Sequence, residues 1–532
     1  MMKKVIKKLL AALLAVAMVC AMAIPAFAYN TEENLNGTHG YSAFQIFKGV
    51  ISKDNMTLSN VEWGRNIPHY EDFLAKLKED PTLKIPFQDA DNLQDVLAVI
   101  SQWSESDNNS IAFARFVCSY LYPDANANPK PVYTDHTGGF NIQEPGYYLI
   151  VDTTYFNPGD FYHAYNSFFL LNVPQAPYVV LVNHKVVKPY VEKEVYDNQD
   201  GTNEAGFGSS ADHAINEEFQ FKLTATLPAS PDRAYDYYKE YAVLFNDTLS
   251  NGITYDRLDS VVIKSNGIPY DITNDSSMYE VDDSRLESDH YFVVGIPDVK
   301  ACGAGLNLND GATITVTYTA HLNDNAAVNS TSGSTDNKNK VQLQYSNNPR
   351  NSAYWGFTPE SEVLVYTYQL NNTKYRDDDT TGNELAGAGF RLYSDKDCTE
   401  EQEIKLKKNT TDGTYSPYFG AGAGDEMFSD EHGQFNVKGL DAGTYYLKET
   451  KTPDGYSACA DKKIVISATH TEYNVSLSGE SNLNNKIINK KAGGITLPST
   501  GGIGTTIFYV VGGGLMVAAI VLLVTKKRME NK

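Results

Sequence analysis

The chain has 532 residues and a formal net charge of −22, and 42% of its residues are hydrophobic. This length suits about three domains of roughly 150 residues, and the apolar content excludes global disorder. The charge excludes nucleic acid as a partner, because nothing in the composition could neutralise a run of phosphates.

Residues 1–28 are predicted to be a secretory signal peptide. Four lysines precede an apolar run from Leu9 to Ile24, and an Ala-Phe-Ala sequence ending at Ala28 follows. A basic region, an apolar region and an A-x-A site in this order are typical of signal peptides. We therefore expect cleavage between Ala28 and Tyr29, and secretion of the mature chain.

A first domain is expected over residues 29–185, and it differs from the rest of the chain in its helical spacing. Apolar residues recur at helical intervals in three segments, 69–80, 91–104 and 109–122. Asp91, with Gln94 three residues later, is a candidate cap for the second segment. We interpret the three segments as a helical insertion in a β domain.

The chain beyond this domain has the alternation of apolar and polar residues that is typical of half-buried strands. Examples are Phe219-Gln-Phe221 and Ile314-Thr-Val316, each bounded by clusters of Gly, Asn and Asp. Turn-rich stretches near Pro189 and Pro349 divide this part into a second domain, 186–360, and a third, 361–491. The sequence therefore predicts an all-β protein of tandem Ig-like sandwiches, the first with a helical insertion.

The end of the sequence has three parts in a fixed order. Leu497-Pro498-Ser499-Thr500-Gly501 comes first, and an uncharged apolar run from Ile507 to Val524 follows, with three cations after it. Eighteen helical residues reach about 27 Å, close to the thickness of a bilayer core. We expect a stalk and motif at 492–502, a transmembrane helix at 503–525 and a basic cytoplasmic tail at 526–532.

This three-part order resembles the cell-wall sorting signal of Gram-positive surface proteins. The resemblance implies that a sortase cuts between Thr500 and Gly501 and holds the Thr500 carbonyl as a thioester until an amine accepts it. The partners that it implies are a class C pilin polymerase, a housekeeping sortase and peptidoglycan.

The sharpest internal motif runs from Tyr445 to Tyr456, YYLKETKTPDGY. It resembles the E-box of pilins, and together with the upstream LAGAGF segment it makes residues 361–491 similar to a CnaB-type domain. The resemblance implies an intramolecular isopeptide bond between Lys374 and Asn489, promoted by Glu449. Three nearby residues leave the assignment of the pair open: Asn484, Asn485 and Lys486.

Such a bond has a clear physical requirement. A solvated lysine is protonated, with a pKa near 10.4, and is not a nucleophile. Burial among aromatic side chains favours the neutral amine, and a buried protonated acid can polarise the amide carbonyl. The reaction occurs once within the folding chain, so we do not expect an enzyme.

The second domain resembles the CnaA-like middle domain of backbone pilins. Lys193 lies between Val191 and Val195, and in a strand all three share one face. An inward lysine is costly unless it is consumed. The resemblance implies Asn339 as its partner and Asp247 as the promoting acid; an exposed lysine and an ordinary turn aspartate are the alternative.

A third lysine would join one subunit to the next. Pilin shaft subunits carry a WxxxVxVYPK segment, and this chain keeps V-x-V-x-x-K over residues 180–185. It lacks the Tyr-Pro, and Ala176 stands where the tryptophan would be. The resemblance implies Lys185 as the exposed acceptor, with Lys188 as the alternative.

Other signals are weak. The sequence DNQDG, which begins at Asp197, lacks the later ligands of a calcium-binding loop. The ten histidines show none of the spacings that are typical of metal sites. We expect no metal and no cofactor. Lys48 has no recognisable acid and amide partners, and Cys398 and Cys459 share a domain and could either pair or remain free.

These features together predict a structural shaft subunit of a sortase-assembled pilus. It would polymerise with copies of itself, join minor pilins, attach to peptidoglycan and support adhesion to host receptors. The alternative is a monomeric wall-anchored adhesin or a minor tip or basal pilin. A secreted hydrolase has no assembled catalytic constellation in this sequence.

Overall fold

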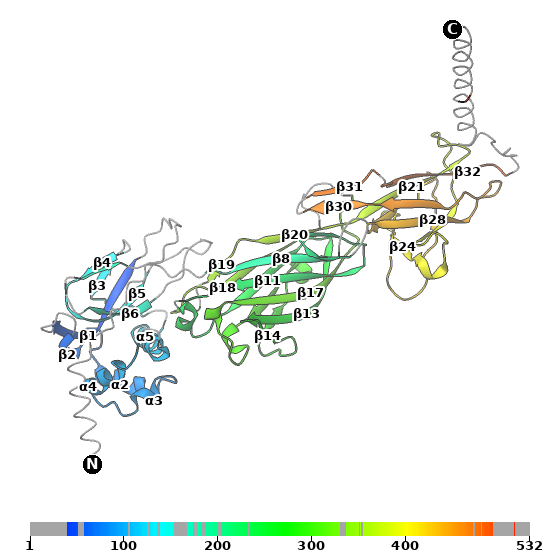
Figure 1. The fold of residues 1–532 in the computed structure, drawn as a ribbon. Coiled ribbons are helices and arrows are strands. Elements are labelled where there is room, and N and C mark those ends of the chain that lie inside the picture. Colours follow the sequence, from blue (N-terminus) through cyan, green and yellow to red (C-terminus); the bar gives the residue numbers. More distant parts are fainter. Residues whose placement is uncertain are drawn as a thin grey trace, which may run out of the picture.

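The computed structural model shows three domains in a row (Figure 1). It describes residues 40–51, 58–104, 107–124, 127–135, 139–153, 168–173, 176, 178–181, 188–198, 205–231, 233–329, 337–350, 352, 355–471, 474–479, 481–492 and 515. Within these residues no helix is long and apolar enough to cross a membrane. Several predicted features lie outside them: the Ala28–Tyr29 site, Lys185, Leu497 to Gly501 and all but one residue of the predicted transmembrane segment 503–525.

The first domain contains a mixed set of strands and helices. Its strands are β1 (Tyr41–Ile51), β2 (Leu58–Trp63), β3 (Tyr133–Asp135), β4 (Gly139–Ile142), β5 (Gly146–Asp152), β6 (Phe168–Val173) and β7 (Tyr178–Leu181). Its helices are α2 (Tyr70–Glu79), α3 (Lys84–Phe87), α4 (Leu93–Ile100) and α5 (Asn108–Leu121). The main sheet has the order β2-β1-β5-β6, with β3 also on β1, and β4 pairs with β7.

The four helices follow β2 and cover one face of the main sheet, as the helical insertion requires. Phe44 and Leu149 from the sheet share a core with Phe73 and Phe113 from the helices. The cap of α4 was predicted one residue too early. Asn92, not Asp91, accepts hydrogen bonds from the backbone amides of residues 94 and 95.

The middle domain is a sandwich of two sheets. One has the order β14-β13-β17-β11-β8-β9 and the other β10-β20-β18-β12-β16-β15, with β19 on β18. The strands are β8 (Tyr190–Asp197), β9 (Gly206–Gly208), β10 (Ser210–Asp212), β11 (Glu218–Leu227), β12 (Val243–Leu249), β13 (Ile253–Ser265), β14 (Ile268–Asp271), β15 (Glu280–Asp282), β16 (Tyr291–Ile296), β17 (Ala312–Leu322), β18 (Lys338–Ser346), β19 (Trp355–Phe357) and β20 (Ser361–Tyr366). Short helical turns connect them: η1 (Ala234–Tyr237), α6 (Leu286–Asp289), η2 (Val299–Ala301) and η3 (Leu308–Asp310).

The boundary after the middle domain lies later than 360/361. Strand β20 pairs with β18 and β10 of the middle domain, so this domain continues to Tyr366. Val363 and Val365 point into the middle core, whereas Leu364 and Tyr366 belong to the core of the third domain. One strand thus serves two cores, because its alternate residues face opposite sides.

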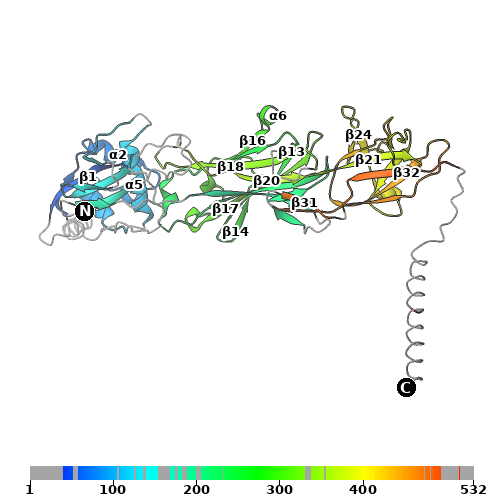
Figure 2. The same ribbon diagram turned by 90° about the horizontal axis from the view of Figure 1, so that it is seen from above.

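The third domain contains two further sheets, β24-β25-β27-β21-β32 and β23-β22-β28-β29 with β26 on β22, and a β30–β31 hairpin. The elements are β21 (Tyr368–Arg376), β22 (Gly389–Tyr393), η4 (Glu400–Gln402), β23 (Glu403–Ile404), β24 (Leu406–Lys408), β25 (Tyr415–Pro417), β26 (Met427–Phe428), β27 (Val437–Leu440), β28 (Gly443–Lys451), β29 (Lys462–Ile466), β30 (Ala468–Thr471), β31 (Asn474–Leu477) and β32 (Asn484–Asn489). Both views show this domain beyond the far end of the middle domain (Figure 2).

Substitution of Phe73 tests how far the stability of the first domain depends on the packing of its helices. Phe73 is fully buried and contacts the rings of Trp63, Phe113, Phe116 and Tyr120. Phe73→Ala should lower the free energy of unfolding of this domain by about 3–5 kcal/mol, since it leaves a cavity. Tryptophan fluorescence during urea unfolding measures the change.

The matched control is Ile85→Ala on α3, where the side chain is 70% exposed. This variant should stay within about 0.5 kcal/mol of the parent. Equal midpoints for Phe73→Ala and the parent would contradict the packing account.

Candidate functional site

The first candidate site surrounds Lys193 in the middle domain. Lys193 lies on β8 opposite Leu223 of β11, and it faces inward between the two sheets on the same side as Val195. Its side chain is completely buried. The alternation of β8 places it there, because every second residue of the strand must face the core.

Two groups contact the Lys193 amine from the opposite sheet and from β17. The Asp247 carboxylate of β12 receives a very short hydrogen bond from Nζ, and Tyr318 Oη lies 3.0 Å from the same atom. Tyr318 in turn donates to the other carboxylate oxygen of Asp247 at 3.1 Å. The rings of Phe221 and Tyr318 have their centroids 5.1 and 5.2 Å from Nζ.

Burial drives the Lys193–Asp247 pair toward its neutral form. It lowers the pKa of Lys193 to about 8, although the Asp247 carboxylate opposes the change. Burial also raises the pKa of Asp247 against the opposing effects of Lys193 and Tyr318. Desolvation penalises the charged forms of both groups, so burial makes the neutral amine and the neutral acid easier to reach than they are in water.

Asn339 completes this cluster. It lies on β18, the neighbour of β12, and is fully buried. Its Nδ2 donates to Tyr318 Oη at 2.5 Å, whereas its Oδ1 has no hydrogen-bond partner among the described residues. The structure therefore brings together Lys193, Asp247 and Asn339, the three residues singled out from the sequence.

Tyr318 was not predicted as a site residue. Its phenol contacts the amine, the acid and the amide of this cluster. In the sequence it continues the inward series of Ile314 and Val316. The alternation of apolar and polar residues predicts that Tyr318 faces inward, as it does for any aromatic residue of the core. It gives no sign that the Tyr318 hydroxyl contacts polar groups.

The second candidate site surrounds Lys374 in the third domain. Lys374 lies on β21 with its side chain fully buried, and β32 runs parallel beside it with Asn489 at its end. Lys374 Nζ donates to Asn489 Oδ1 at 2.5 Å and lies 5.2 Å from the centroid of the Phe390 ring. Burial lowers the pKa of Lys374, while nearby Cys459 and Glu449 act in the opposite direction.

Glu449 of β28 stands between the two nitrogens of this pair. Its Oε1 lies 3.5 Å from Lys374 Nζ and accepts a hydrogen bond from Asn489 Nδ2 at 2.7 Å. Its Oε2 accepts from the backbone amide of Cys459 at 2.8 Å. One carboxyl oxygen is thus within reach of both the amine and the amide nitrogen.

The neighbouring residues that left the sequence assignment open are engaged elsewhere. Asn485 donates to Asn372 at 3.1 Å, and Lys486 forms an exposed ion pair with Asp379. Asn484 accepts a hydrogen bond from Asn371. Among the alternatives, Asn489 is therefore the amide that contacts the buried lysine.

The two cysteines of the third domain are free thiols. Cys398 lies near the Asp461 carboxylate, with its sulfur 3.9 Å away. Cys459 lies beside the Lys374 site, and burial raises the pKa of its thiol to about 11. The structure thus gives the unpaired form of the two that the sequence allowed.

Two further lysines considered from the sequence, Lys48 and Lys188, are described by the structure, and neither is fully buried. Lys48 is half exposed and pairs with Glu62 at 2.8 Å on the surface of the first domain. Lys188 is partly buried, and Lys185 lies outside the described residues.

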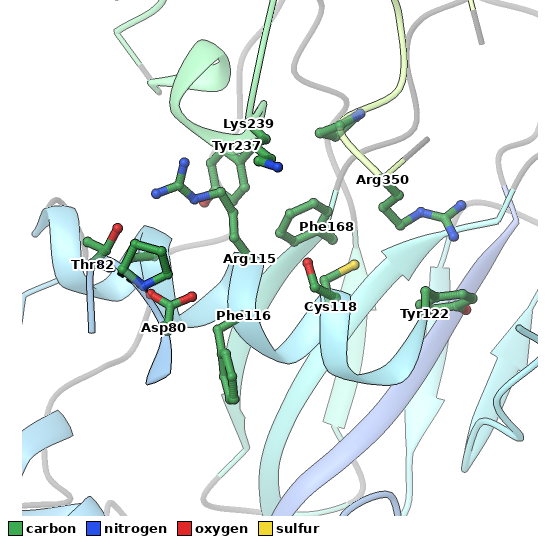
Figure 3. Close-up of a pocket in the computed structure, with 14 residues that line it drawn as sticks. Asp80, Thr82, Arg115, Phe116, Cys118, Tyr122, Phe168, Tyr237, Lys239 and Arg350 are labelled. Carbon is green, nitrogen blue, oxygen red and sulfur yellow. Dashed lines mark hydrogen bonds between the residues drawn. The ribbon is translucent and has the colours of Figure 1, made fainter. Parts of the chain in front are cut away.

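A cavity of about 310 Å³ lies between the first and middle domains. Figure 3 shows Arg115 of α5, Lys239 and Arg350 around it, with Tyr122 and Phe168 at its wall. The Arg350 guanidinium lies over the Tyr122 ring and donates to the Asp152 carbonyl at 2.9 Å. This cavity is separate from both buried lysines.

Two family models match the sequence. Residues 371–481 match the prealbumin-like fold domain of the SpaA family, and residues 489–531 match the LPXTG cell wall anchor motif. No curated protein matches the chain.

Several solved structures are similar to this one. The T6 backbone pilin of serotype M6 Streptococcus pyogenes is 16% identical, with a TM-score of 0.47 over 86% of this chain and 97% of that one. The full-length major pilin SpaD of Corynebacterium diphtheriae is 16% identical, with a TM-score of 0.42 over 88% and 95%. A C-terminal fragment of the Streptococcus agalactiae major pilin GBS80 is 20% identical, with a TM-score of 0.40 over 57% and 99%.

The matched anchor contains the Leu497–Gly501 motif, and the matched fold domain contains Lys374 and Glu449. The chain is thus a cell-wall-anchored surface protein of the Gram-positive type, and residues 371–481 of its third domain are similar to the prealbumin-like SpaA domain.

Proposed function

We propose that this protein is the shaft subunit of a covalent pilus, stiffened by an isopeptide bond in each of its last two domains. The observation that carries the proposal is the pair of buried lysines, each in contact with a carboxyl group and close to a buried asparagine. Burying a lysine amine that does not react would lower the stability of the domain, because the amine loses its hydration.

The reaction that we propose is the same in both domains. The neutral lysine Nζ attacks the asparagine Cγ, a bond forms between these atoms, and the Cγ–Nδ2 bond breaks. The amine loses a proton and Nδ2 gains one, so ammonia leaves and an amide remains. Glu449 suits this transfer because its Oε1 reaches both nitrogens. In the middle domain Asp247 reaches the amine, and Tyr318 links it to Asn339.

Such bonds would join strands that carry the load of a pulled fibre. Lys374 lies on the first strand of its domain and Asn489 on the last, 115 residues later. By the chain-entropy model for cross-links, closing a loop of this size removes about 5 kcal/mol of unfolded-state entropy. An amide also resists thiols, which suits a structure outside the cell.

Polymerisation requires an amine on the next subunit. We propose that sortase transfers the Thr500 carbonyl to Lys185, with the last subunit passed to peptidoglycan and with minor pilins joined by the same chemistry. The LPXTG anchor motif supports the donor half of this proposal. Adhesion to a host surface would follow from the position of the fibre.

Mass spectrometry of the mature ectodomain, residues 29–500, tests the internal bonds. The mass should fall short of the sequence mass by two ammonia molecules, about 17 Da for each bond. Lys374→Ala should lack only one ammonia relative to its own sequence mass, because it removes the nucleophile of the third domain.

Lys486→Ala is the matched control, since Lys486 lies in the same domain on an exposed ion pair. Like the parent, this variant should lack two ammonia molecules relative to its sequence mass. A parent protein with the full sequence mass would refute both bonds.

Tyr318→Phe tests the relay in the middle domain. It keeps the ring that packs on Phe221 and Phe292 but removes the hydroxyl that links Asp247 to Asn339. Formation of the Lys193–Asn339 cross-link should slow by about tenfold or more. The cross-linked peptide is measured by mass spectrometry at intervals after refolding, and an unchanged rate would remove Tyr318 from the mechanism.

Lys185→Ala tests the acceptor and the shaft role in cells that make the sortase. The parent should give a ladder of multimers that resists SDS, and the variant should lose it because the accepting amine is gone. Lys188→Ala is the control and should keep the ladder.

A ladder that survives Lys185→Ala but not Lys188→Ala would assign the acceptor to Lys188. Labelling with an antibody against residues 29–500 in the electron microscope should follow fibres along their length. Label spread evenly over the wall would favour the adhesin instead.

A further inference from the structure

The junction between the middle and third domains contains a buried cluster that the bond chemistry does not use. Asp197 ends β8 and Asp212 ends β10, both in the middle domain, whereas His470 lies on β30 of the third domain. One ligand atom from each of the three lies within 4.8 Å of the other two. Figure 1 draws β30 and β31 at the end of the third domain that faces the middle domain.

The two carboxylates are almost completely buried, Asp197 at 4% and Asp212 at 0% exposure. Within the described part of the chain, the basic group that pairs with Asp197 is His470, whose Nε2 lies 3.2 Å from Asp197 Oδ2. Two buried negative charges a few ångströms apart repel one another and lose their hydration. A positive charge between them would offset this repulsion.

The oxygen atoms of Asp212 give the second, independent observation. Oδ2 accepts a hydrogen bond from Tyr368 Oη at 2.7 Å. Oδ1 is buried and has no hydrogen-bond partner among the described residues. A buried carboxylate oxygen without a partner is costly, and here it belongs to a carboxylate that lies against Asp197 and His470.

The orientation of His470 also suits metal binding. Its Nδ1 lies 2.9 Å from Ser210 Oγ, and its Nε2 faces Asp197. With the proton on Nδ1 and donated to the serine, the lone pair of Nε2 is directed toward Asp197. Metal-binding histidines are commonly held by such a hydrogen bond from the other ring nitrogen.

We propose that Asp197, Asp212 and His470 bind one divalent cation of the zinc class and that this cation fastens the third domain to the middle domain. Imidazole with two carboxylates suits zinc, whereas calcium prefers an all-oxygen shell of six or more ligands. Ligands at about 2.1 Å from a tetrahedral zinc are about 3.4 Å apart, close to the spacing of His470 and Asp197. The fourth position is left for water.

A second cluster at the same junction serves as an internal comparison. It contains His213, Glu217 and Asp441, whose ligand atoms also lie within 4.8 Å of one another. Glu217 accepts a hydrogen bond from the Ala214 amide at 3.0 Å, and Asp441 accepts one from Asn198 at 2.9 Å. The first cluster differs in Asp212 Oδ1, a buried carboxylate oxygen that has no hydrogen-bond partner among the described residues. We therefore assign the cation to the first cluster.

The test uses the mature ectodomain, stripped with EDTA and then supplied with Zn²⁺ or Co²⁺. The parent should bind about one zinc per chain and unfold at a higher temperature with zinc than without it. Co²⁺ should give the visible absorption of a four-coordinate site. Asp212→Asn keeps the shape of the side chain and the contact with Tyr368, and it should weaken zinc binding at least about tenfold.

The matched control is Glu217→Gln, which changes one carboxylate of the second cluster and should bind zinc as the parent does. His470→Gln removes the ligand that the third domain supplies, and it provides a second route if Asp212→Asn does not fold. Protein that binds no stoichiometric zinc would overturn the proposal. Zinc retained by both ligand variants, or lost in Glu217→Gln, would also overturn it. These outcomes do not depend on the lysine bonds or on sortase.

Discussion

An amine buried between two β-sheets is the constraint on which the rest of this structure depends. The Lys193 amine lies near two aromatic rings and the Lys374 amine near one, and a carboxyl group contacts each of them. Removing a charged lysine from water costs several kcal/mol even when a partner is present. The neutral amine avoids part of this cost, and it is also the nucleophilic form. The burial that would destabilise an ordinary ion pair therefore favours the proposed isopeptide reaction.

Much of the architecture could be predicted from periodicity. The three helical segments of the first domain correspond to α2, α4 and α5, and the alternating segments of the middle domain correspond to β11 and β17. The boundary at 360 was wrong because Val363-Leu364-Val365-Tyr366 was assigned to one domain. Four consecutive apolar residues indicate a strand buried on both faces. In β20 those two faces belong to different domains, and periodicity alone does not report which partner each face has.

The candidate sites divide in the same way. Lys193 stood out because it is an inward charge between two apolar residues, and a local pattern can show that. No local pattern of this kind points to Tyr318, or to Asp197 and Asp212 at the junction of the middle and third domains. The phenol of Tyr318 acquires its role from Asp247 and Asn339 on other strands. Asp197 and His470 are distant in sequence, and only the docking of two domains brings them into contact.

The two junctions of the molecule therefore differ in how they transmit force. Between the middle and third domains the chain passes from β20 to β21 with only Thr367 between them, and β20 belongs to both cores. Between the first and middle domains lies a cavity bordered by Arg115, Lys239 and Arg350. Packed side chains resist bending better than a cavity does. In the proposed fibre, tension should thus act on the middle and third domains as one body, and bending should occur beside the first domain.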